Sequence, residues 1–167
     1  MTVRHARAGT LVVLTACMAS LITAQAPLAT ASASAGAASA STSPAEARAK
    51  QRINAFRAGN GVRALRSSRS LDRSASAYAR FMLRRGFFGH QPRIQASGSF
   101  RMLGETLLLQ PGRRARSGVA VRGWAGSPGH RAVLLNAGFR QMGVGTASGR
   151  FRGGRKVTMW VAQVARR

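Results

Sequence analysis

The only cysteine of the chain, Cys17, lies in an N-terminal segment that has the features of a secretory signal peptide. Arg4 and Arg7 precede an uncharged apolar run at 10–23, and at about 14 residues this run is too short to span a bilayer. An Ala-x-Ala cleavage motif closes the segment 1–26, so we expect a signal peptide there and a secreted mature protein. Without cysteine the mature chain cannot form a disulfide, and its fold has to be stabilised by packing alone.

A lipoprotein anchor at Cys17 is the alternative for this segment. Leu14-Thr15-Ala16-Cys17 resembles a lipoprotein processing site, which would leave an acylated cysteine at the start of the mature chain. The apolar run continues beyond the cysteine through Met18, Leu21 and Ile22, as it does in an ordinary signal peptide. We therefore favour a released extracellular protein over an anchored one.

Basic residues outnumber acidic ones by 27 to 3, which gives the chain a formal charge of +24. Such a charge attracts polyanions, namely anionic lipid headgroups, cell-wall polymers or nucleic acid. The alternative is compositional drift, because the chain is rich in the Ala, Arg and Gly that GC-rich codons encode. Aromatic residues do not alternate with the densest basic clusters, 113–116 and 150–156, so the stacking pattern of single-strand binders is missing. Only nonspecific nucleic-acid binding is therefore expected.

Order is expected to begin at Ser43. Residues 27–42 consist mainly of Ala, Ser and Thr and are predicted to form a disordered spacer with nothing to bury. Ser43-Pro44-Ala45-Glu46 is a capping box, which starts a helix that should end at the Gly-Asn-Gly sequence 59–61. The ordered domain is therefore assigned to residues 43–167.

A second helix is predicted from about residue 70 to Gly86, because its apolar residues recur at helical spacing. Phe87 and Phe88 are expected to fill the core just beyond it. The polar segment 91–103 is expected to be a loop, and residues 107–109 fit either a short strand or a helical turn.

The C-terminal third predicts two short helices and a hairpin. Helical spacing and strand alternation place helices at 117–125 and 128–136 and strands at 142–146 and 157–164, joined by the Gly- and Arg-rich segment 148–155. Val121, Trp124 and Trp160 are expected to lie in the core, where a tryptophan is more often found than at a ligand platform.

Two histidines and one glutamate are the candidate site residues, because the chain is poor in both residue types. His90, Glu105 and His130 together match the ligand set of a catalytic zinc site with one open position, and zinc or another divalent cation is the cofactor they would hold. Their spacing lacks the His-x-x-x-His helix pair of known zinc hydrolases. The alternative is a structural network in which each histidine bonds to backbone groups and Glu105 pairs with an arginine.

A catalytic role for Ser127 is the weaker hypothesis. Ser127 could act as a nucleophile with His130 as its base, but it precedes Pro128 at a predicted helix start, where serine is an ordinary N-cap. No second carboxylate is placed to support acid–base work on a glycosidic bond. The sequence therefore favours a binding protein over an enzyme.

The order of several motifs resembles that of the bacterial branch of the CAP superfamily, which comprises cysteine-rich secretory proteins, antigen 5, pathogenesis-related 1 proteins and SCP-like extracellular proteins. The similarity covers about residues 45–165, and its most specific element is the tryptophan followed by Ser-Pro-Gly-His-Arg. The matching segments are Ile53–Arg57, Arg85–His90, Gly104-Glu105, Trp124–Arg131, Leu135-Asn136, Gly143-Val144-Gly145 and Trp160–Val164.

This resemblance implies an α+β fold, a three-layer α-β-α sandwich, with a central cleft lined in many members by two histidines and two acids. His90, Glu105 and His130 match three of these four positions, and Ser127 stands where some members carry the second acid. The usual asparagine after Gly-Glu is Thr106, and an acidic position of the first helix is Phe56. Gln163 is expected either to close a strand edge or to face the cleft.

The family resemblance points to extracellular binding of lipids, sterol-like ligands or envelope components. We expect a secreted monomeric binding module, with an arginine-rich surface for anionic lipid or cell-wall polymer. Its cleft at His90, Glu105, Ser127 and His130 would take a small hydrophobic ligand or a metal ion. Two other classes stay open: a metal-dependent hydrolase that uses the same cleft, and a cationic nucleic-acid- or membrane-active protein in which the cleft plays no part.

Overall fold

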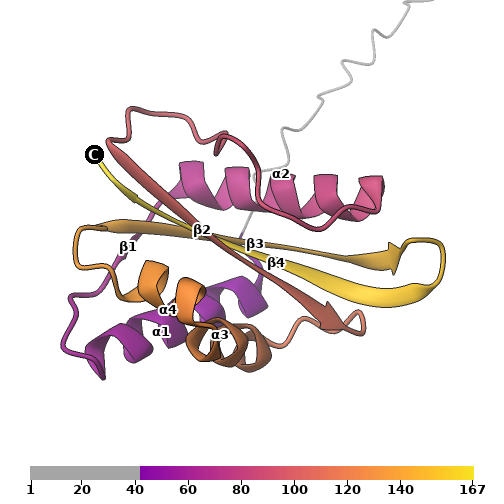
Figure 1. The fold of residues 1–167 in the computed structure, drawn as a ribbon, viewed down its shortest axis with the longest axis horizontal. Helices are drawn as coiled ribbons and strands as arrows, with labels where there is room; N and C mark the ends of the chain where they lie inside the picture. The colour runs from indigo at the N-terminus through magenta and orange to yellow at the C-terminus, as the bar shows by residue number, and fades with distance from the viewer. Residues whose placement is uncertain (1–41) are drawn as a thin grey trace, which may run out of the picture. The chain divides into compact units, whose positions relative to one another are not determined.

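The computed structural model describes residues 42–167, so the predicted signal peptide, Cys17 and nearly all of the predicted spacer lie outside the described residues. A four-stranded sheet lies between two layers of helices (Figure 1). The elements in chain order are α1 (Pro44–Ala58), β1 (Arg66–Ser67), α2 (Arg69–Arg85), β2 (Met102–Pro111), α3 (Ser117–Gly126), α4 (Pro128–Leu135), β3 (Gln141–Phe151) and β4 (Arg155–Arg166). This arrangement confirms the predicted three-layer α-β-α sandwich.

The sheet has the strand order β1-β3-β4-β2, with β4 in the interior. β4 pairs antiparallel with β3 on one side and with β2 on the other, whereas the short β1 runs parallel to β3. Gln163 of β4 is the partner of Glu105 on β2 and of Gly143 on β3. β4 therefore joins β2, the edge strand that carries Glu105, to the rest of the sheet.

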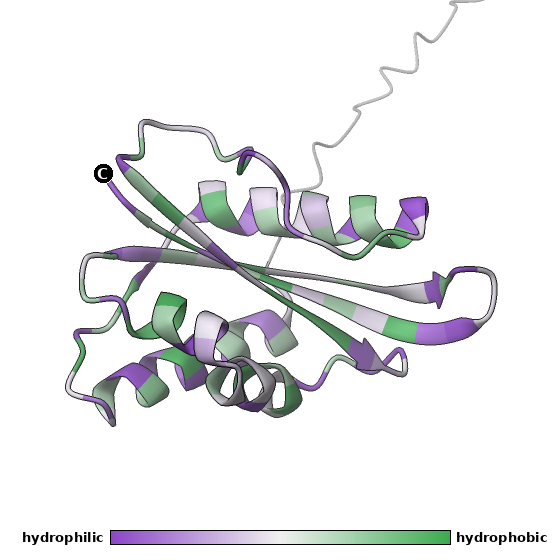
Figure 2. Ribbon diagram, viewed as in Figure 1, coloured by the Kyte–Doolittle hydropathy of each residue, from purple (hydrophilic) through white to green (hydrophobic). Residues whose placement is uncertain are grey.

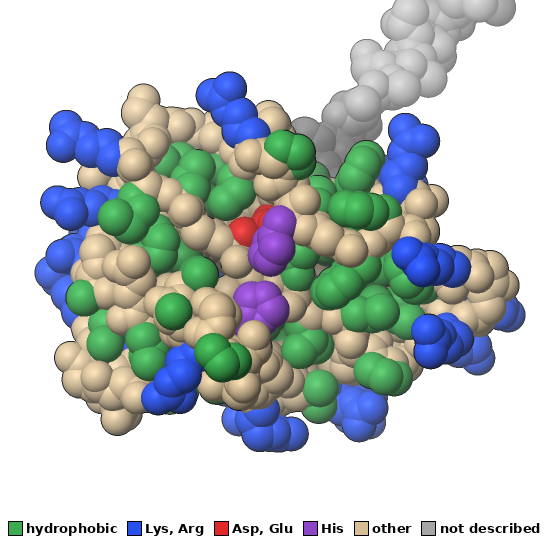
Figure 3. All heavy atoms as spheres, in the orientation of Figure 1, with side chains coloured by type: hydrophobic (Ala, Val, Ile, Leu, Met, Phe, Trp, Pro, Cys, Tyr) green, Lys and Arg blue, Asp and Glu red, His purple; other side chains and the backbone are tan. Residues whose placement is uncertain are grey.

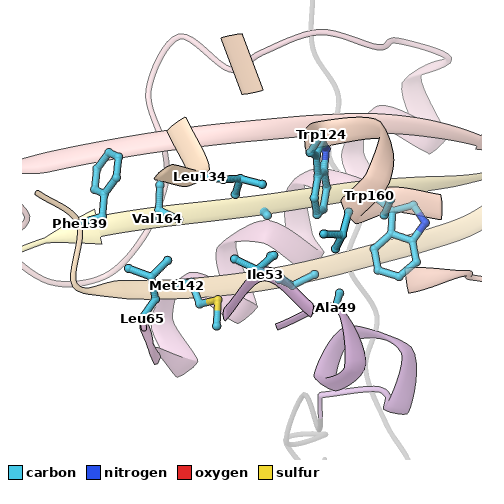
Figure 4. Close-up of a cluster of buried hydrophobic side chains, with 13 residues drawn as sticks. Ala49, Ile53, Leu65, Trp124, Leu134, Phe139, Met142, Trp160 and Val164 are labelled. Carbon is cyan, nitrogen blue, oxygen red and sulfur yellow. The ribbon is translucent and has the colours of Figure 1, made fainter. Parts of the chain in front are cut away.

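Alternation along β4 divides the core into two halves, because successive side chains of a strand point to opposite faces. Trp160, Ala162 and Val164 belong to the cluster that α1, α3 and α4 cover, which also contains Ile53 and Trp124. Figure 4 shows these side chains packed between the helices and the sheet. Val157, Met159 and Val161 belong to the opposite cluster, which packs against Ala75, Tyr78, Ala79 and Met82 of α2. The hydropathy colouring shows apolar and polar residues interspersed along the helices and strands (Figure 2).

Two glycines of β3 let α2 lie directly on the sheet. A Cβ atom at Gly143 would stand 2.2 Å from the carbonyl carbon of Leu71, and one at Gly145 would stand 2.1 Å from the backbone nitrogen of Ser76. Backbone at such distances cannot move aside as a flexible side chain can. Gly143 and Gly145 therefore fix the depth at which α2 sits on β3.

Two of the three acidic residues close the edge of β3 that β1 leaves open. β1 pairs only with Gln141 and Met142, so the next outward N–H groups of β3 need other acceptors. Asp72 accepts from the Val144 N–H at 2.9 Å and pairs with the buried Lys50 ammonium at 3.0 Å. Glu46 accepts from the Thr146 N–H at 2.8 Å while it also completes the capping box at Ser43. These carboxylates therefore join α2 and α1 to the same strand.

Several sequence-based predictions need correction. Phe87 and Phe88 do not fill the core; they are 43% and 39% exposed, because the chain turns outward after Gly86. The segment at 107–109 is part of the longer strand β2, which begins at Met102 inside the predicted loop. The hairpin strands also extend into the segment expected to join them, so only residues 152–154 separate β3 from β4. Within residues 42–167, no helix combines the length and the apolar character needed to cross a membrane.

Candidate functional site

Glu105 is the centre of a polar cluster at the edge strand β2. Its Oε2 accepts hydrogen bonds from Gln91 Nε2 at 2.6 Å and from Gln163 Nε2 at 3.1 Å, and its Oε1 lies 3.0 Å from His90 Nδ1. The carboxylate is nearly buried, with a side-chain exposure of 5%, whereas the His90 side chain is 57% exposed. The cluster is therefore closed at Glu105 and open to solvent at His90. The alternative network, in which Glu105 pairs with an arginine, is not found among the described residues.

His90 is positioned by the turn that ends α2. Gly86 adopts the left-handed conformation that commonly terminates a helix, and the chain then runs back toward β2. Tyr78 of α2 holds this turn, because its hydroxyl donates a hydrogen bond of 2.6 Å to the carbonyl of Gly89. Burial, and secondarily the charge of Glu105, raise the pKa of Tyr78 above its ordinary value, which keeps the phenol protonated as a donor. The turn and the Tyr78 hydrogen bond therefore fix the backbone that places His90 next to Glu105.

His130 approaches the same cluster from the opposite helical layer. It lies in the first turn of α4, and its ring centroid is 6.1 Å from that of His90. Burial, and secondarily the proximity of His90, lower the pKa of His130 below its ordinary value of 6.5. A neutral imidazole is therefore favoured at His130 near neutral pH. Figure 3 shows two histidines and an acidic side chain together at the middle of one face, with lysine and arginine side chains around its margin.

The helix that carries His130 is anchored by a buried arginine. The Arg57 guanidinium of α1 donates hydrogen bonds to the carbonyls of Leu134 and Asn136 at the C-terminal end of α4, and its Nε donates to the Arg63 carbonyl at 2.8 Å. A cation at this end of a helix also interacts favourably with the helix dipole. Arg57 therefore fixes the position of α4 relative to α1.

Ser127 occupies the N-cap position of α4 and the C-cap position of α3. Its side chain makes no capping hydrogen bond, and no hydrogen bond joins it to His130 among the described residues. The serine therefore has the predicted place at a helix start without the predicted capping contact. Nothing in this geometry prepares Ser127 to lose its proton to a base, which a nucleophilic serine requires.

The arrangement does not fit a metal site made of His90, Glu105 and His130. No group of three or more potential ligand residues among residues 42–167 is placed to hold a metal ion. A carboxylate only accepts hydrogen bonds, so the 3.0 Å contact requires the proton on His90 Nδ1 and leaves Nε2 facing away from Glu105. Glu105 thus orients His90 instead of acting as a third ligand. Two imidazoles alone fall short of the three protein ligands of a catalytic zinc site.

Three residues of the cluster were not singled out by sequence reasoning in this role. Gln91 and Tyr78 contact the site through the turn after α2, and neither spacing nor composition indicates that contact. The sequence allows Gln163 either to close a strand edge or to face the site, and its hydrogen bond to Glu105 makes it part of this polar cluster. The strand register is the signal that could have decided this case, since Gln163 and Glu105 are ladder partners.

Comparison with known proteins agrees with this fold. The sequence model of the cysteine-rich secretory protein family, abbreviated CAP, matches residues 50–164. No curated protein matches the chain significantly.

Similar solved structures come from several organisms. An extracellular SCP-domain protein from Bacillus anthracis has a TM-score of 0.60 at 20% identity, over 74% of this chain and 40% of that chain. An outer surface protein from Borrelia burgdorferi has a TM-score of 0.59 at 17% identity, over 75% of this chain and 95% of that one. Venom allergen-like protein 4 from Schistosoma mansoni has a TM-score of 0.53 at 10% identity, over 75% of this chain and 91% of that chain. The chain thus spans less than half of the Bacillus protein, and likeness at these identities concerns the fold.

Proposed function

The chain belongs to the cysteine-rich secretory protein (CAP) family, and from this premise we propose that it is an extracellular binding module for anionic components of the cell envelope. The ligand would be an anionic lipid headgroup or a cell-wall polymer, held by the cleft at His90, Glu105 and His130 together with the arginine-rich surface around it. The names of two structural neighbours, an extracellular protein and an outer surface protein, support an extracellular place for this chain.

The observation that carries the proposal is the pre-formed polar cluster at Glu105. Its one carboxylate is saturated by Gln91, Gln163 and His90, so it orients its neighbours and is poorly placed to abstract a proton. His90 is left open to solvent with one ring nitrogen free of Glu105, and His130 lies beside it. Two neighbouring imidazoles, one of them exposed to solvent, suit recognition of a polar headgroup, because each can donate or accept a hydrogen bond.

The surface charge supports an anionic ligand. Among residues 42–167 the two ion pairs are Lys50–Asp72 and His90–Glu105, so the arginines of this part of the chain have no carboxylate partner. Four of them converge on a hollow of about 430 Å³ at the start of α3, namely Arg48, Arg52, Arg114 and Arg116. Clustered cations attract polyanions and raise their local concentration. The arginine surface would therefore bring an anionic polymer or membrane close to the cleft.

Vesicle binding tests the proposal. We would measure sedimentation with phosphatidylglycerol vesicles and with phosphatidylcholine vesicles at roughly 150 mM salt. The variant His90→Ala/Glu105→Gln/His130→Ala is compared with the wild type after both are shown to be folded by circular dichroism. We expect the wild type to bind the anionic vesicles and the cleft variant to bind them at least about tenfold more weakly, a difference of roughly 1.4 kcal/mol. Undiminished binding by the cleft variant would overturn the proposal.

The other two functional classes, a protein that binds through charge alone and a metal-dependent hydrolase, predict different results. A protein that acts through charge alone loses binding steeply as salt rises and is indifferent to Glu105→Gln. A metal-dependent hydrolase requires stoichiometric metal in the purified protein and loses activity on His130→Ala. Repeating the vesicle titration over a range of salt concentrations, with and without Glu105→Gln, therefore separates cleft binding from charge binding.

A further inference from the structure

A hollow of about 430 Å³ lies between α1 and the loop that leads into α3. No acidic residue lines it, and four arginines do, namely Arg48, Arg52, Arg114 and Arg116. All four are exposed, and none takes part in the two ion pairs found within residues 42–167. Because clustered like charges repel one another, an anion bound in this hollow would stabilise it.

The arginines of the hollow come in pairs from two fixed walls. Arg48 and Arg52 are four residues apart on α1, so their side chains leave the same face of that helix. The opposite wall is fixed by Gln110, which is 1% exposed. Its side-chain amide donates to the Arg114 carbonyl at 2.7 Å and accepts from the Arg116 N–H at 3.0 Å. The backbone of both walls is therefore in place before any ligand binds.

The first turn of α3 adds hydrogen-bond donors to the hollow. The N–H groups of Ser117 and Gly118 have no acceptor within residues 42–167, and α3 has neither a side-chain cap nor an acidic residue in its first turn. Such a helix start attracts anions. Ser117 is an independent indication, because it lines the hollow, is only 7% exposed, and makes no side-chain hydrogen bond to another described residue. A buried hydroxyl without a protein partner usually bonds to a ligand or to water.

The tip of the β3–β4 hairpin extends this positive surface. Arg150 and Lys156 are direct partners across the ladder, where like charges are unfavourable. Strand alternation places both on the same face of the sheet as Trp160, which α1 and α3 cover. The Gly112 N–H donates to the Lys156 carbonyl at 2.8 Å, so the tip adjoins the arginine loop, and Figure 1 shows the β3–β4 turn and the end of β2 at the same end of the sheet. We call the hollow together with Arg150 and Lys156 the basic track.

The chemistry of the basic track favours phosphate groups. Guanidinium groups on two walls and the N–H groups of α3 line the hollow, and a tetrahedral phosphate can accept hydrogen bonds from more directions than a planar carboxylate. None of the exposed large apolar side chains within residues 42–167 lies on the track; they are Phe81, Phe87, Phe88, Met102 and Leu103. The track therefore offers no place for an acyl chain or for the stacking of nucleobases.

We propose that the basic track binds a linear polymer of phosphate groups that carries neither acyl chains nor nucleobases. One phosphate would lie in the hollow between the α1 arginines and Ser117, and the following phosphates would reach Arg150 and Lys156. The shared chemistry is the phosphate repeat, and its source is either a polyol phosphate or inorganic polyphosphate. The inference rests on the proposed function, in which a cell-wall polymer is one ligand, and adds to it the chemistry of the polymer and a second place of contact.

Glycerol 3-phosphate tests the hollow alone, because the ten residues of α3 separate the hollow from His130 by about 15 Å. In the mature protein we expect the backbone N–H signals of Ser117 and Gly118 to shift along one saturating NMR curve. Acetate at the same ionic strength should leave these signals nearly unmoved. Ser117→Ala should weaken binding by about fivefold, the value of one hydrogen bond, whereas His90→Ala/His130→Ala should leave the curve unchanged. The absence of a saturable shift would overturn the inference.

Polymer binding is measured by calorimetry with oligo(glycerol phosphate), polyphosphate and oligothymidylate of equal charge, at roughly 150 mM salt. We expect the base-free polymers to bind, with the tighter one identifying the source, and oligothymidylate to bind at least about tenfold more weakly. Arg48→Gln/Arg52→Gln should weaken polymer binding by at least about tenfold. The matched control is Arg69→Gln/Arg73→Gln, which removes two charges at the same helical spacing from exposed positions of α2 and should have a far smaller effect.

Arg150→Gln/Lys156→Gln tests the continuity of the basic track. This variant should weaken the polymers and spare glycerol 3-phosphate, because the monomer occupies the hollow only. Unchanged polymer affinity in this variant would overturn the inference of a polymer ligand.

Two further outcomes would overturn the inference. Equal losses in the α1 and α2 arginine variants would mean that net charge alone attracts the polymer. Oligothymidylate binding as tight as that of the better base-free polymer would favour a nucleic-acid partner. The cleft proposal fails if the variant His90→Ala/Glu105→Gln/His130→Ala retains its vesicle binding, whereas this inference fails if Gly118 does not respond to glycerol 3-phosphate, so the two can fail separately.

Discussion

Glu105 and Gln163 face each other across the β2–β4 ladder, and Gln163 Nε2 donates a hydrogen bond of 3.1 Å to Glu105 Oε2. Gln163 is fully buried, and within residues 42–167 its amide oxygen has no hydrogen-bond partner, so the bond to Glu105 is the contact that orients its amide group. A residue of the interior strand thereby fixes the one carboxylate of the cleft.

Zinc binding is the first prediction that follows from this relationship. A metal ion at Glu105 would have to displace Gln163, Gln91 and His90 from its two oxygens. We therefore expect calorimetry on the mature domain to show zinc binding weaker than micromolar. Micromolar or tighter binding that His90→Ala/His130→Ala abolishes would contradict this expectation and favour the metal-dependent hydrolase.

Removing the charge of Asp72 should destabilise the domain strongly. The Lys50–Asp72 pair is buried, with side-chain exposures of 10% and 11%, and Asp72 also accepts from the Val144 N–H. Losing one partner of a buried pair typically costs about 3–5 kcal/mol, because the remaining charge stays buried. We expect Asp72→Asn to lower the free energy of unfolding by about 3 kcal/mol in urea denaturation. The neighbouring exposed substitution Arg73→Gln is the control, and a similar effect of both changes would refute the edge-closing role of Asp72.

Adding one methyl group at Gly145 should also destabilise the folded domain. Its Cβ would meet the backbone of Ser76 at 2.1 Å, so α2 would have to move off β3. Overpacking of this kind costs about 1–3 kcal/mol. The matched control is Gly154→Ala at the hairpin turn, where a Cβ meets nothing within 4 Å. Thermal unfolding should show a lower midpoint temperature for Gly145→Ala and an unchanged one for Gly154→Ala. Equal midpoint temperatures for the two variants would mean that α2 does not pack directly on Gly145.

The lowered pKa of His130 predicts a pH dependence of stability. Because the folded-state pKa lies below the unfolded value of 6.5, the unfolded chain takes up the proton first as the pH falls. The contribution of neutral His130 is therefore fully present above pH 6.5 and is lost as the pH falls through the folded-state pKa. Between pH values of about 7.5 and 5, the wild type should lose more stability than His130→Gln.

A titration by NMR checks the physical cause of this shift. The His130 ring should titrate below 6.5, and His90→Gln should move that pKa upward because it removes the nearby imidazole. Identical slopes of stability against pH in the wild type and in His130→Gln, or an unshifted His130 ring, would contradict the burial argument.

Local sequence signals account for most of the helical structure. The capping box at Ser43 and the left-handed Gly86 mark the start of α1 and the end of α2 because capping depends on a few adjacent residues. Trp124 and Trp160 lie in the core as their apolar periodicity predicts.

Local sequence patterns do not predict contacts between residues that are far apart in the chain. The exposure of Phe87 and Phe88 depends on where the chain travels after Gly86, which no local pattern specifies. The roles of Asp72 and Glu46 at the edge of β3 depend on strand order, and the contact of Gln163 with Glu105 depends on register. The scarcity of histidine and acidic residues, together with the family resemblance, indicates His90, Glu105 and His130, but only their geometry distinguishes an orienting carboxylate from a metal ligand.

The central claim, that the cleft contacts an anionic envelope ligand, is tested most directly by the ring signals of its histidines. Of the three histidines in the sequence, His5 belongs to the predicted signal peptide, so the mature domain should give only the signals of His90 and His130. Titration with a soluble short-chain phosphatidylglycerol should shift both rings with one saturating curve that matches the affinity measured by calorimetry. Saturable binding that leaves both rings unmoved would place the ligand elsewhere and contradict the account.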